Sequence, residues 1–296
     1  MKRLIVIAGP TASGKTSLAI RIAQHYNTEI VSADSRQCYK ELNIGVARPT
    51  EEELASVRHH FIASHSIHDQ ISAGTYEQLA LAYCNTIFET NDTAVLVGGT
   101  GLYIKALCEG IDEMPAVDED IAMQCETLYE ERGLLWLQRE VQEQDIEFYE
   151  QAEIDNPRRL LRALIFKLST GQSILDYRNA QAKDRPFAIE YFVVDIPREE
   201  LYERINTRVV QMFAQGQLAE AKELYEYRHN KNLETVGYSE CFEFFDGHGS
   251  IEDVIAKVQQ HTRHYAKRQV TWFKKMYPQG FMAQEDILKA ATKFTR

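Results

Sequence analysis

The chain opens with an apolar segment, a glycine-rich loop and a helix, and this succession constrains the fold more than any other feature. Leu4–Ala8 is a short apolar run of the kind found in strands that are buried on both faces of a sheet. Gly9 and Pro10 end the run, and Thr16–Tyr26 then shows the apolar spacing of a helix. A buried strand that leads into a helix is the first part of a βαβ unit, so we expect a parallel sheet.

The same alternation continues along the chain. Three more short apolar runs predict strands, and three longer segments have the spacing of helices. Strands that alternate with helices indicate further βαβ units of one parallel sheet. The predicted strands are Glu29–Ala33, Ala94–Val97 and Phe192–Ile196, and the predicted helices are Thr75–Thr90, Arg198–Arg228 with a break near Gly216, and Ser250–Tyr277.

The loop between the first strand and the first helix reads GPTASGKT and fits the pattern G-x-x-x-x-G-K-[ST] at each fixed position. Its glycines let backbone amides approach an anion, and the helix N-terminus attracts negative charge. Lys15 adds a positive charge, and the hydroxyl of Thr16 is a ligand for Mg²⁺. The alternative is a chance match in a glycine-rich turn. We therefore predict a site for a diphosphate or triphosphate with Mg²⁺, formed by Gly9, Pro10, Thr11, Ala12, Ser13, Gly14, Lys15 and Thr16.

A carboxylate is predicted beside this phosphate loop. P-loop NTPases usually place an acid at the end of another core strand, yet the strand at Ala94–Val97 ends in Gly-Gly-Thr. Asp195 lies in a predicted strand, but Pro197 follows that strand at once, and a structural role suits Asp195 as well. Asp34 follows the strand after the loop helix, and parallel strands bring their carboxyl ends to one edge. Asp34 is thus expected near the phosphates as a metal ligand or general base, unless it only caps the next turn.

One long segment interrupts the alternation. Residues 114–187 are helix-forming, polar and without strand signals, and a proline follows both Met114 at its start and Arg185 at its end. The predicted fold class is α/β, a P-loop NTPase-like parallel sheet core flanked by helices, with an all-helical insertion. The predicted divisions are residues 1–113 for the first part of the core, 114–187 for the insertion and 188–296 for the second part of the core.

Charge is unevenly distributed. The chain of 296 residues carries 33 basic and 44 acidic side chains, a net charge of −11. That balance opposes non-specific binding of nucleic acid by the whole surface, but it allows local basic tracks. Two clusters are candidates for an RNA track, and the alternative is that both are solvated helix faces. The first includes Arg158, Arg159 and Arg162, and the second includes Lys267 and Arg268.

Several function classes are disfavoured by the sequence. No apolar run approaches the roughly 18 residues needed to span a bilayer, and no signal-peptide cleavage site is visible, so a cytoplasmic protein is expected without contact to a membrane. The five cysteines form no CxxC pair, which excludes a zinc knuckle and a disulfide framework. Four histidines, at positions 59, 60, 65 and 68, are irregularly spaced, and we interpret them as loop packing rather than metal ligands.

Eight segments spread along the chain resemble those of the tRNA dimethylallyltransferases, also called tRNA isopentenyltransferases. A phosphate loop alone would be weak support, whereas its combination with DSRQCYKELNIGVARP, VGGTGLYIKAL and AKRQVTWFKK is specific. The order and spacing match from end to end, and we expect the bacterial type, which lacks the zinc-finger extension of eukaryotic members. The segments are residues 9–16, 34–49, 59–62, 97–107, 155–164, 204–216, 236–238 and 266–275.

The resemblance implies a reaction in which a dimethylallyl group passes from dimethylallyl diphosphate to N6 of the adenosine 3′ of the tRNA anticodon. Diphosphate is released and Mg²⁺ is required. Asp34 is then the general base, and Lys15, Thr16 and Arg208 complete the catalytic set, with Arg208 on the diphosphate. By the same resemblance the residues that bind tRNA are Asp34, Ser35, Arg36, Gln37, Thr100, Arg158, Arg159, Arg162, Lys267 and Arg268.

The chain departs from the family pattern in two places. Ser239 and Glu240 stand where many bacterial members have the arginine-rich segment VGYRQ, and no arginine lies near Ala122 at the start of the insertion. We expect a stronger dependence on the two remaining basic clusters, or a narrower set of tRNAs.

Three other functions are weighed against this one. A cytokinin-type isopentenyltransferase would prenylate free adenine nucleotides, but it would not need the helical insertion or the basic C-terminal helix. A P-loop small-molecule kinase would consume ATP, and the Asp34 and Gly-Gly-Thr strand ends argue against it. A nucleotide-dependent RNA-binding switch would bind tRNA without changing its mass. We expect a monomer, because one chain supplies every group that the reaction needs.

Overall fold

The computed structural model describes residues 1–177 and 182–293. The chain divides into two compact units, one of residues 1–110 with 183–296 and one of residues 111–182. Residues 178–181 of the predicted insertion at 114–187 lie outside the described residues. The same holds for residues 294–296 of the predicted second core part at 188–296.

The chain rejoins the larger unit earlier than residue 188. The backbone N–H of Lys183 donates to the carbonyl of Glu109 at 2.7 Å, and Arg185 donates to the carbonyls of Ala106 and Leu107. Arg185 also pairs with the buried carboxylate of Glu77 at 2.8 Å. These contacts explain why residues 183–187 belong with the core and not with the insertion.

The larger unit is built on a parallel sheet of six strands in the order β3-β2-β4-β1-β5-β6. The predicted α/β fold class is confirmed, as are the strands predicted at Leu4–Ala8, Glu29–Ala33 and Ala94–Val97. The edge strands β3 and β6 have two residues each, too few for a periodic pattern. The strands are β1 (Arg3–Ala8), β2 (Ile30–Ser32), β3 (His59–His60), β4 (Thr93–Gly98), β5 (Ala188–Val194) and β6 (Phe281–Met282).

The strand predicted at Phe192–Ile196 is displaced in the structure. Strand β5 begins at Ala188 and ends at Val194, so Asp195 lies beyond it. The extra residues at its start pair with β1, from Arg3 opposite Ala188 onward. Tertiary pairing, which local periodicity does not report, therefore sets the boundaries of this strand.

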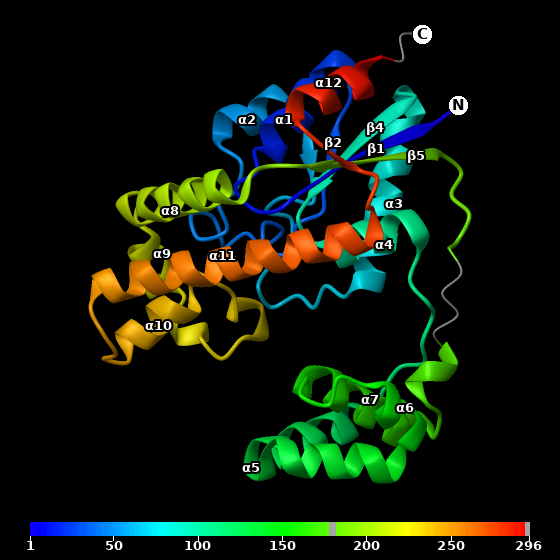
Figure 1. The fold of residues 1–296 in the computed structure, drawn as a ribbon, viewed down its shortest axis with the longest axis vertical. Helices are drawn as coiled ribbons and strands as arrows, with labels where there is room; N and C mark the ends of the chain where they lie inside the picture. Colours follow the sequence, from blue (N-terminus) through cyan, green and yellow to red (C-terminus); the bar gives the residue numbers. More distant parts are fainter. Residues whose placement is uncertain (178–181, 294–296) are drawn as a thin grey trace. The chain divides into compact units, whose positions relative to one another are not determined.

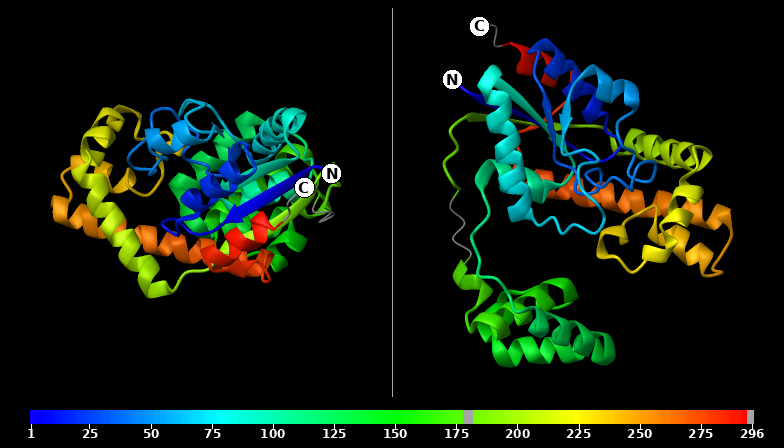
Figure 2. Two further views of the ribbon diagram at one scale, coloured as in Figure 1. Left: turned by 90° about the horizontal axis from the view of Figure 1, so that it is seen from above. Right: turned by 180° about the vertical axis from the view of Figure 1, so that it is seen from behind.

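Helices cover both faces of the sheet (Figures 1 and 2). Apolar residues of α1 and α12 pack on one face, where Leu18 and Ile287 join Ile5 and Val95 in a continuous core. On the other face Tyr76 of α3 donates to the carbonyl of Ser32 in β2. The helices of this unit are α1 (Lys15–His25), α2 (Glu51–Ser56), α3 (Ala73–Thr90), α4 (Gly101–Glu109), α8 (Arg198–Ala214), α9 (Gln217–Glu223), α10 (Ser239–Phe245), α11 (Ile251–Met276) and α12 (Gln284–Thr292), with the short 3₁₀ turns η2 (Tyr225–Tyr227) and η3 (Lys231–Leu233).

The smaller unit is helical and has a core of its own. Leu137 and Val141 of α5 pack with Phe148 and with Leu160 and Leu164 of α7 in one buried cluster. The backbone of α5 is interrupted in the middle by a glycine, residue 133, at φ 74°. Its elements are α5 (Glu119–Gln144), α6 (Ile146–Gln151), α7 (Pro157–Thr170) and the 3₁₀ turn η1 (Ile174–Tyr177).

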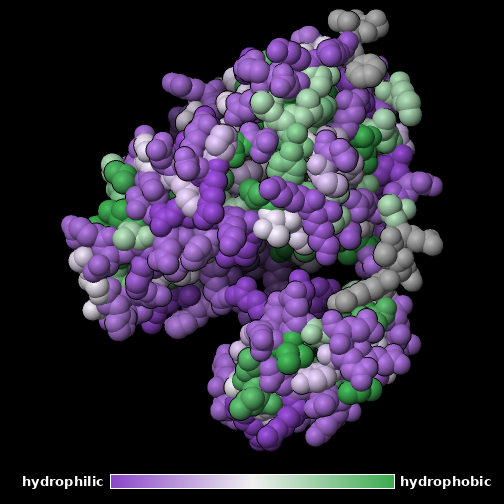
Figure 3. All heavy atoms as spheres, viewed as in Figure 1, coloured by the Kyte–Doolittle hydropathy of each residue, from purple (hydrophilic) through white to green (hydrophobic). Residues whose placement is uncertain are grey.

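The surface is largely polar. Hydrophilic side chains cover most of the face drawn in Figure 3. Among the helices in the described ranges, none combines the length and the apolar character that crossing a membrane requires.

Candidate functional site

The glycine-rich loop leads from β1 directly into α1. Gly14 precedes the helix with φ 80°, a left-handed conformation that favours glycine. A Cβ at this position would lie 2.5 Å from Nε2 of Gln284, which donates to the carbonyl of Ser13 at 2.6 Å. The loop is thus held from the side of α12, and its helix N-terminus is available for an anion.

A small cavity of about 50 Å³ adjoins this loop. Its wall contains Lys15 and Thr16 from the start of α1, Asp34 from the end of β2, and Arg208 from α8. The four residues that the sequence assigned to catalysis therefore line one space. Thr11 and Gln37 line the same cavity.

Burial shapes the electrostatics of this cavity. Loss of hydration lowers the pKa of Lys15 to about 8, while the charge of Asp34 opposes the shift and that of Arg208 adds to it. Burial also lowers the pKa of Arg208, again opposed by Asp34. Two partly buried cations beside one carboxylate form a site that favours a polyanion, because an anion would compensate for the hydration that the cations have lost.

The orientation of Asp34 is set by the turn that follows β2. Its Oδ1 accepts hydrogen bonds from the backbone N–H groups of Arg36 and Gln37, at 2.9 and 3.2 Å. The amide of Gln37 donates to the carbonyls of Val46 and Ala47, so this side chain also holds the following loop. Asp34 therefore caps the turn and also lines the cavity. The two roles that the sequence left open for it, a turn cap and a carboxylate near the phosphates, are compatible.

The carboxyl end of β4 brings Thr100 to the other side of Asp34. The Thr100 hydroxyl accepts from the backbone N–H of Ser35 at 3.1 Å and lies 3.3 Å from the Ser35 hydroxyl. Arg36 donates to the carbonyl of Asn232 at 3.0 Å, which orients it along the same edge. Three of the residues that the resemblance assigns to tRNA binding thus form one polar group with Asp34.

Helix α11 contributes Gln269, which the sequence analysis did not single out, and two aromatic residues of the same basic helix. Gln269 is buried, accepts from the N–H of Thr11 at 2.9 Å and donates to the carbonyl of Gly99 at 2.8 Å. Tyr265, one turn earlier, hydrogen-bonds to the side chain of Thr100, and burial raises its pKa to about 12. A Cβ on Gly101 would lie 2.1 Å from Trp272. The helical spacing of Tyr265, Gln269 and Trp272 was the available signal, because these residues share one face of the helix.

Helix α8 supplies two arginines to a larger cavity of about 740 Å³ that opens beside the loop. Arg208 donates to the Thr11 hydroxyl and to the carbonyl of Ala47, both at 3.4 Å. Arg204, one turn earlier, is exposed and pairs with Glu200 at 2.6 Å. Arg208 therefore points inward, whereas Arg204, on the same helix, is exposed.

The two basic clusters are both exposed. On α7, Arg158, Arg159 and Arg162 lie at the surface, and Arg159 pairs with Glu153 at 2.9 Å. On α11, Lys267 and Arg268 are exposed. Each cluster is accessible to a large polyanion.

The departures from the family pattern have local structural roles. Glu240 is buried, accepts from the N–H of Gly237 at 2.7 Å and pairs with His261 at 2.6 Å. Ser239 begins α10, and its hydroxyl donates to the carbonyl of Thr235.

The residues present fit a magnesium ion better than a zinc ion. In the described part of the chain, no group of three or more His, Cys, Asp or Glu side chains could hold a metal. Mg²⁺ needs only one or two protein ligands when substrate phosphates and waters complete its shell. The Thr16 hydroxyl and the Asp34 carboxylate, which line one cavity, meet that requirement. The five cysteines are all buried, as small apolar side chains would be.

Comparison with known proteins identifies the family. The family model described as IPP transferase matches residues 37–276. The tRNA dimethylallyltransferase of Christiangramia forsetii is 45% identical over 272 residues, covering 92% of this chain and 90% of that protein. The enzyme of the same name from Flavobacterium johnsoniae is 41% identical over 281 residues, covering 93% and 91%.

A solved structure gives the same result. The full-length tRNA isopentenylpyrophosphate transferase from Bacillus halodurans aligns with a TM-score of 0.72 and 30% sequence identity, over 99% of this chain and 95% of that one. The matched family model covers most of the α/β core and all of the helical unit. The phosphate loop, the Asp34 turn and α11 thus occur in a chain that belongs to the IPP transferase family.

Proposed function

We propose that this protein transfers the dimethylallyl group of dimethylallyl diphosphate to N6 of the adenosine 3′ of the anticodon in tRNA, with release of diphosphate. One observation carries the proposal. The phosphate loop and the carboxylate of Asp34 line the same cavity, in a chain whose relatives are named tRNA dimethylallyltransferases. Such a cavity places a diphosphate leaving group beside a base.

The chemistry follows from the groups around the cavity. The amine N6 attacks C1 of the dimethylallyl group, the bond from C1 to the diphosphate oxygen breaks, and the N6 proton passes to Asp34. The loop amides, Lys15 and Arg208 stabilise the negative charge that develops on the departing diphosphate. When bound at Thr16, Mg²⁺ would supply further positive charge to the same oxygens. Alignment of the two substrates supplies much of the rate enhancement.

The base must leave its stack in the anticodon loop to reach this cavity. Ser35, Gln37 and Thr100 surround Asp34 and would position the extruded adenine, together with Arg36. Arg158, Arg159 and Arg162 of α7 and Lys267 and Arg268 of α11 would bind the phosphates of the anticodon arm, because exposed arginines and lysines serve that role.

The other functions are less well supported. The relatives at 41–45% identity carry the name tRNA dimethylallyltransferase, which favours tRNA over a free nucleotide as acceptor. The carboxyl end of β4 carries glycines and Thr100 and no acid, unlike the ATP-hydrolysing enzymes with this loop. We further propose a cytoplasmic monomer, which size-exclusion chromatography with light scattering would test.

The deciding experiment is mass spectrometry of nucleosides from unmodified tRNA that has been incubated with the protein, dimethylallyl diphosphate and Mg²⁺. We expect isopentenyladenosine from the unchanged protein and none from Asp34→Ala. Prenylation of added AMP but not of tRNA would instead support the cytokinin-type reaction. Consumption of ATP without transfer to either acceptor would support the kinase.

A further inference from the structure

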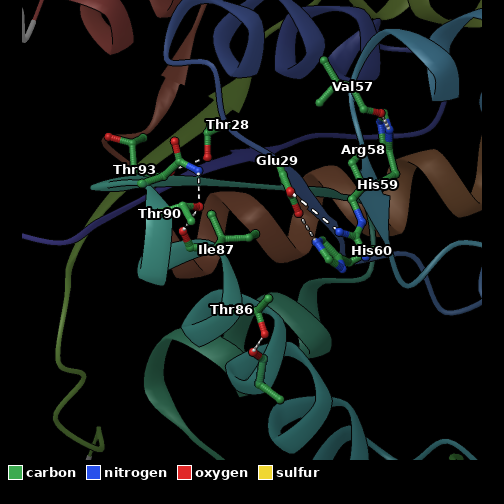
Figure 4. A network of polar contacts seen from close by, with 12 residues as sticks. Thr28, Glu29, Val57, Arg58, His59, His60, Thr86, Ile87, Thr90 and Thr93 are labelled. Atoms are coloured by element: carbon green, nitrogen blue, oxygen red, sulfur yellow. Dashed lines mark hydrogen bonds and ion pairs between the residues drawn. The ribbon is translucent and has the colours of Figure 1, made fainter.

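The two histidines of strand β3 are adjacent in sequence but differ in their partners. Successive side chains of a strand point to opposite faces. His60 is buried, and its Nε2 lies 2.5 Å from a carboxylate oxygen of Glu29 (Figure 4). Its ring also stacks on that of Tyr83. These contacts give His60 a structural role and leave its Nε2 with a partner.

His59 is held at one ring nitrogen only. Its Nδ1 lies 2.8 Å from the carbonyl oxygen of Val57 (Figure 4). Because a carbonyl can only accept, Nδ1 must carry the hydrogen, and in the neutral ring Nε2 then bears a lone pair. Burial lowers the pKa of His59, which keeps the ring neutral.

The lone pair of His59 lacks a protein donor. Nε2 is inaccessible to solvent and has no hydrogen-bond partner within the part of the chain that the structure describes. Buried polar atoms of this kind are normally satisfied, and an exception indicates a missing ligand or water. His59 lines the cavity that also contains Thr16, Asp34 and Arg208.

Two of the three charged side chains that line the cavity are donors, and the third, Asp34, is an acceptor whose Oδ1 already accepts from the N–H groups of Arg36 and Gln37. Lys15 and Arg208 can only donate, and the amide hydrogens of Gln37 are already bound to carbonyls. A Mg²⁺ ion bound through phosphates keeps several waters, whose hydrogens point away from the metal and need acceptors. A neutral imidazole nitrogen meets that need without adding charge.

We propose that His59 is a positioning residue of the metal–diphosphate site, where its Nε2 accepts a hydrogen bond from a water of the Mg²⁺ shell. The inference rests on the proposed function, since it requires Mg²⁺ and diphosphate at the phosphate loop. Groups that orient the ligands of a metal typically change its affinity by about 10- to 100-fold when they are removed.

Calorimetry tests this on the full chain, with inorganic diphosphate as titrant at a series of fixed free Mg²⁺ concentrations. The Kd for diphosphate without Mg²⁺ measures binding to the phosphate loop. The decrease in this Kd with Mg²⁺ measures the contribution of the metal. We expect His59→Leu to retain the Kd measured without Mg²⁺ and to need about 10- to 100-fold more Mg²⁺ for the same decrease.

Two amide variants distinguish loss of the hydrogen-bond acceptor at position 59 from loss of side-chain packing there. His59→Gln can place its amide oxygen where Nε2 lies, so it should respond to Mg²⁺ as the unchanged protein does. His59→Asn can still donate to Val57 but is too short to place an acceptor there, so it should behave as His59→Leu. This pair decides the question even if His59→Leu fails to fold, and His60→Gln is the control on the same strand.

Each other outcome has a definite meaning. A normal Mg²⁺ response in His59→Asn and His59→Leu would overturn the role of His59 while leaving the proposed function intact. An equal loss in His59→Asn, His59→Gln and His60→Gln would assign the effect to strand packing and also overturn it. Failure of the unchanged protein to bind diphosphate, with or without Mg²⁺, would overturn the proposed function and this inference together.

Discussion

The charged residues beside the phosphate loop and those on α7 are held in different ways. Lys15 and Arg208 are only partly exposed, and both have pKa values lowered by loss of hydration. Arg158 and Arg159 are exposed, and Arg159 pairs with Glu153 at the surface. Interactions between charges are several-fold stronger away from water, whereas exposed charges are screened within about 8–10 Å in physiological salt. One partly buried charge can therefore matter more than several exposed ones.

This difference gives a rule for substitutions. In the cavity beside the loop, we propose that each group acts on one part of the reaction, so its loss should be large and insensitive to salt. On the basic face of α7 the groups act together on a polyanion, so each loss should be small, salt-dependent and nearly additive. We expect the losses on substitution to decrease from Asp34 in the cavity to Arg162 on α7.

The largest effect is expected from Asp34→Asn. The amide keeps the shape of the side chain but cannot take the N6 proton, so the rate of transfer should fall by about 10²- to 10⁴-fold. Single-turnover assays with saturating substrates measure this rate. The affinity for tRNA should remain, and a loss below tenfold would remove Asp34 from the role of base.

A smaller loss is expected from Arg208→Gln, about 10²- to 10³-fold in kcat/KM, because it removes a partly buried donor from the leaving group. Arg208→Lys should not restore activity, since an ammonium lacks the planar fork that reaches both the Thr11 hydroxyl and the Ala47 carbonyl. Arg204→Gln is the matched control, one turn away on α8 and exposed. Equal losses in Arg204→Gln and Arg208→Gln would break the distinction between partly buried and exposed charges.

Gln269→Leu should lower the stability of the protein and also remove a hydrogen bond that holds the phosphate loop. It leaves the N–H of Thr11 and the carbonyl of Gly99 without their present partner, at a cost of about 1–3 kcal/mol in the free energy of unfolding. Urea denaturation measures this cost. Thr271→Ala, on the exposed side of α11, should stay within about 0.5 kcal/mol of the unchanged protein.

The smallest single effect is expected from Arg162→Gln on α7. The affinity for tRNA should fall a few-fold, and the slope of log Kd against log salt should decrease by about 0.7–1. Binding titrations at several salt concentrations give this slope, and Kd for dimethylallyl diphosphate should not change. An unchanged slope would identify this surface as a solvated helix face.

The sequence predicted more of the residues that line the cavity than of the residues that hold them in place. GPTASGKT is a contiguous pattern whose geometry is local, so its residues could be named before the fold was known. Gln269 could not, because its partner Thr11 is more than 150 residues away in the chain. The end of β5 was likewise misplaced, since its pairing with β1 decides its limits.

By itself the sequence determined the α/β class, the phosphate loop and the identity of Asp34 as the acid at a strand end. These depend on hydrophobic periodicity and on short-range backbone geometry, which neighbouring residues dictate. Only the tertiary structure decided that Arg208 points inward while Arg204 is exposed, and that His59 and His60 have different partners. Burial and hydrogen-bond satisfaction depend on residues distant in sequence, and they become defined only when the chain has packed.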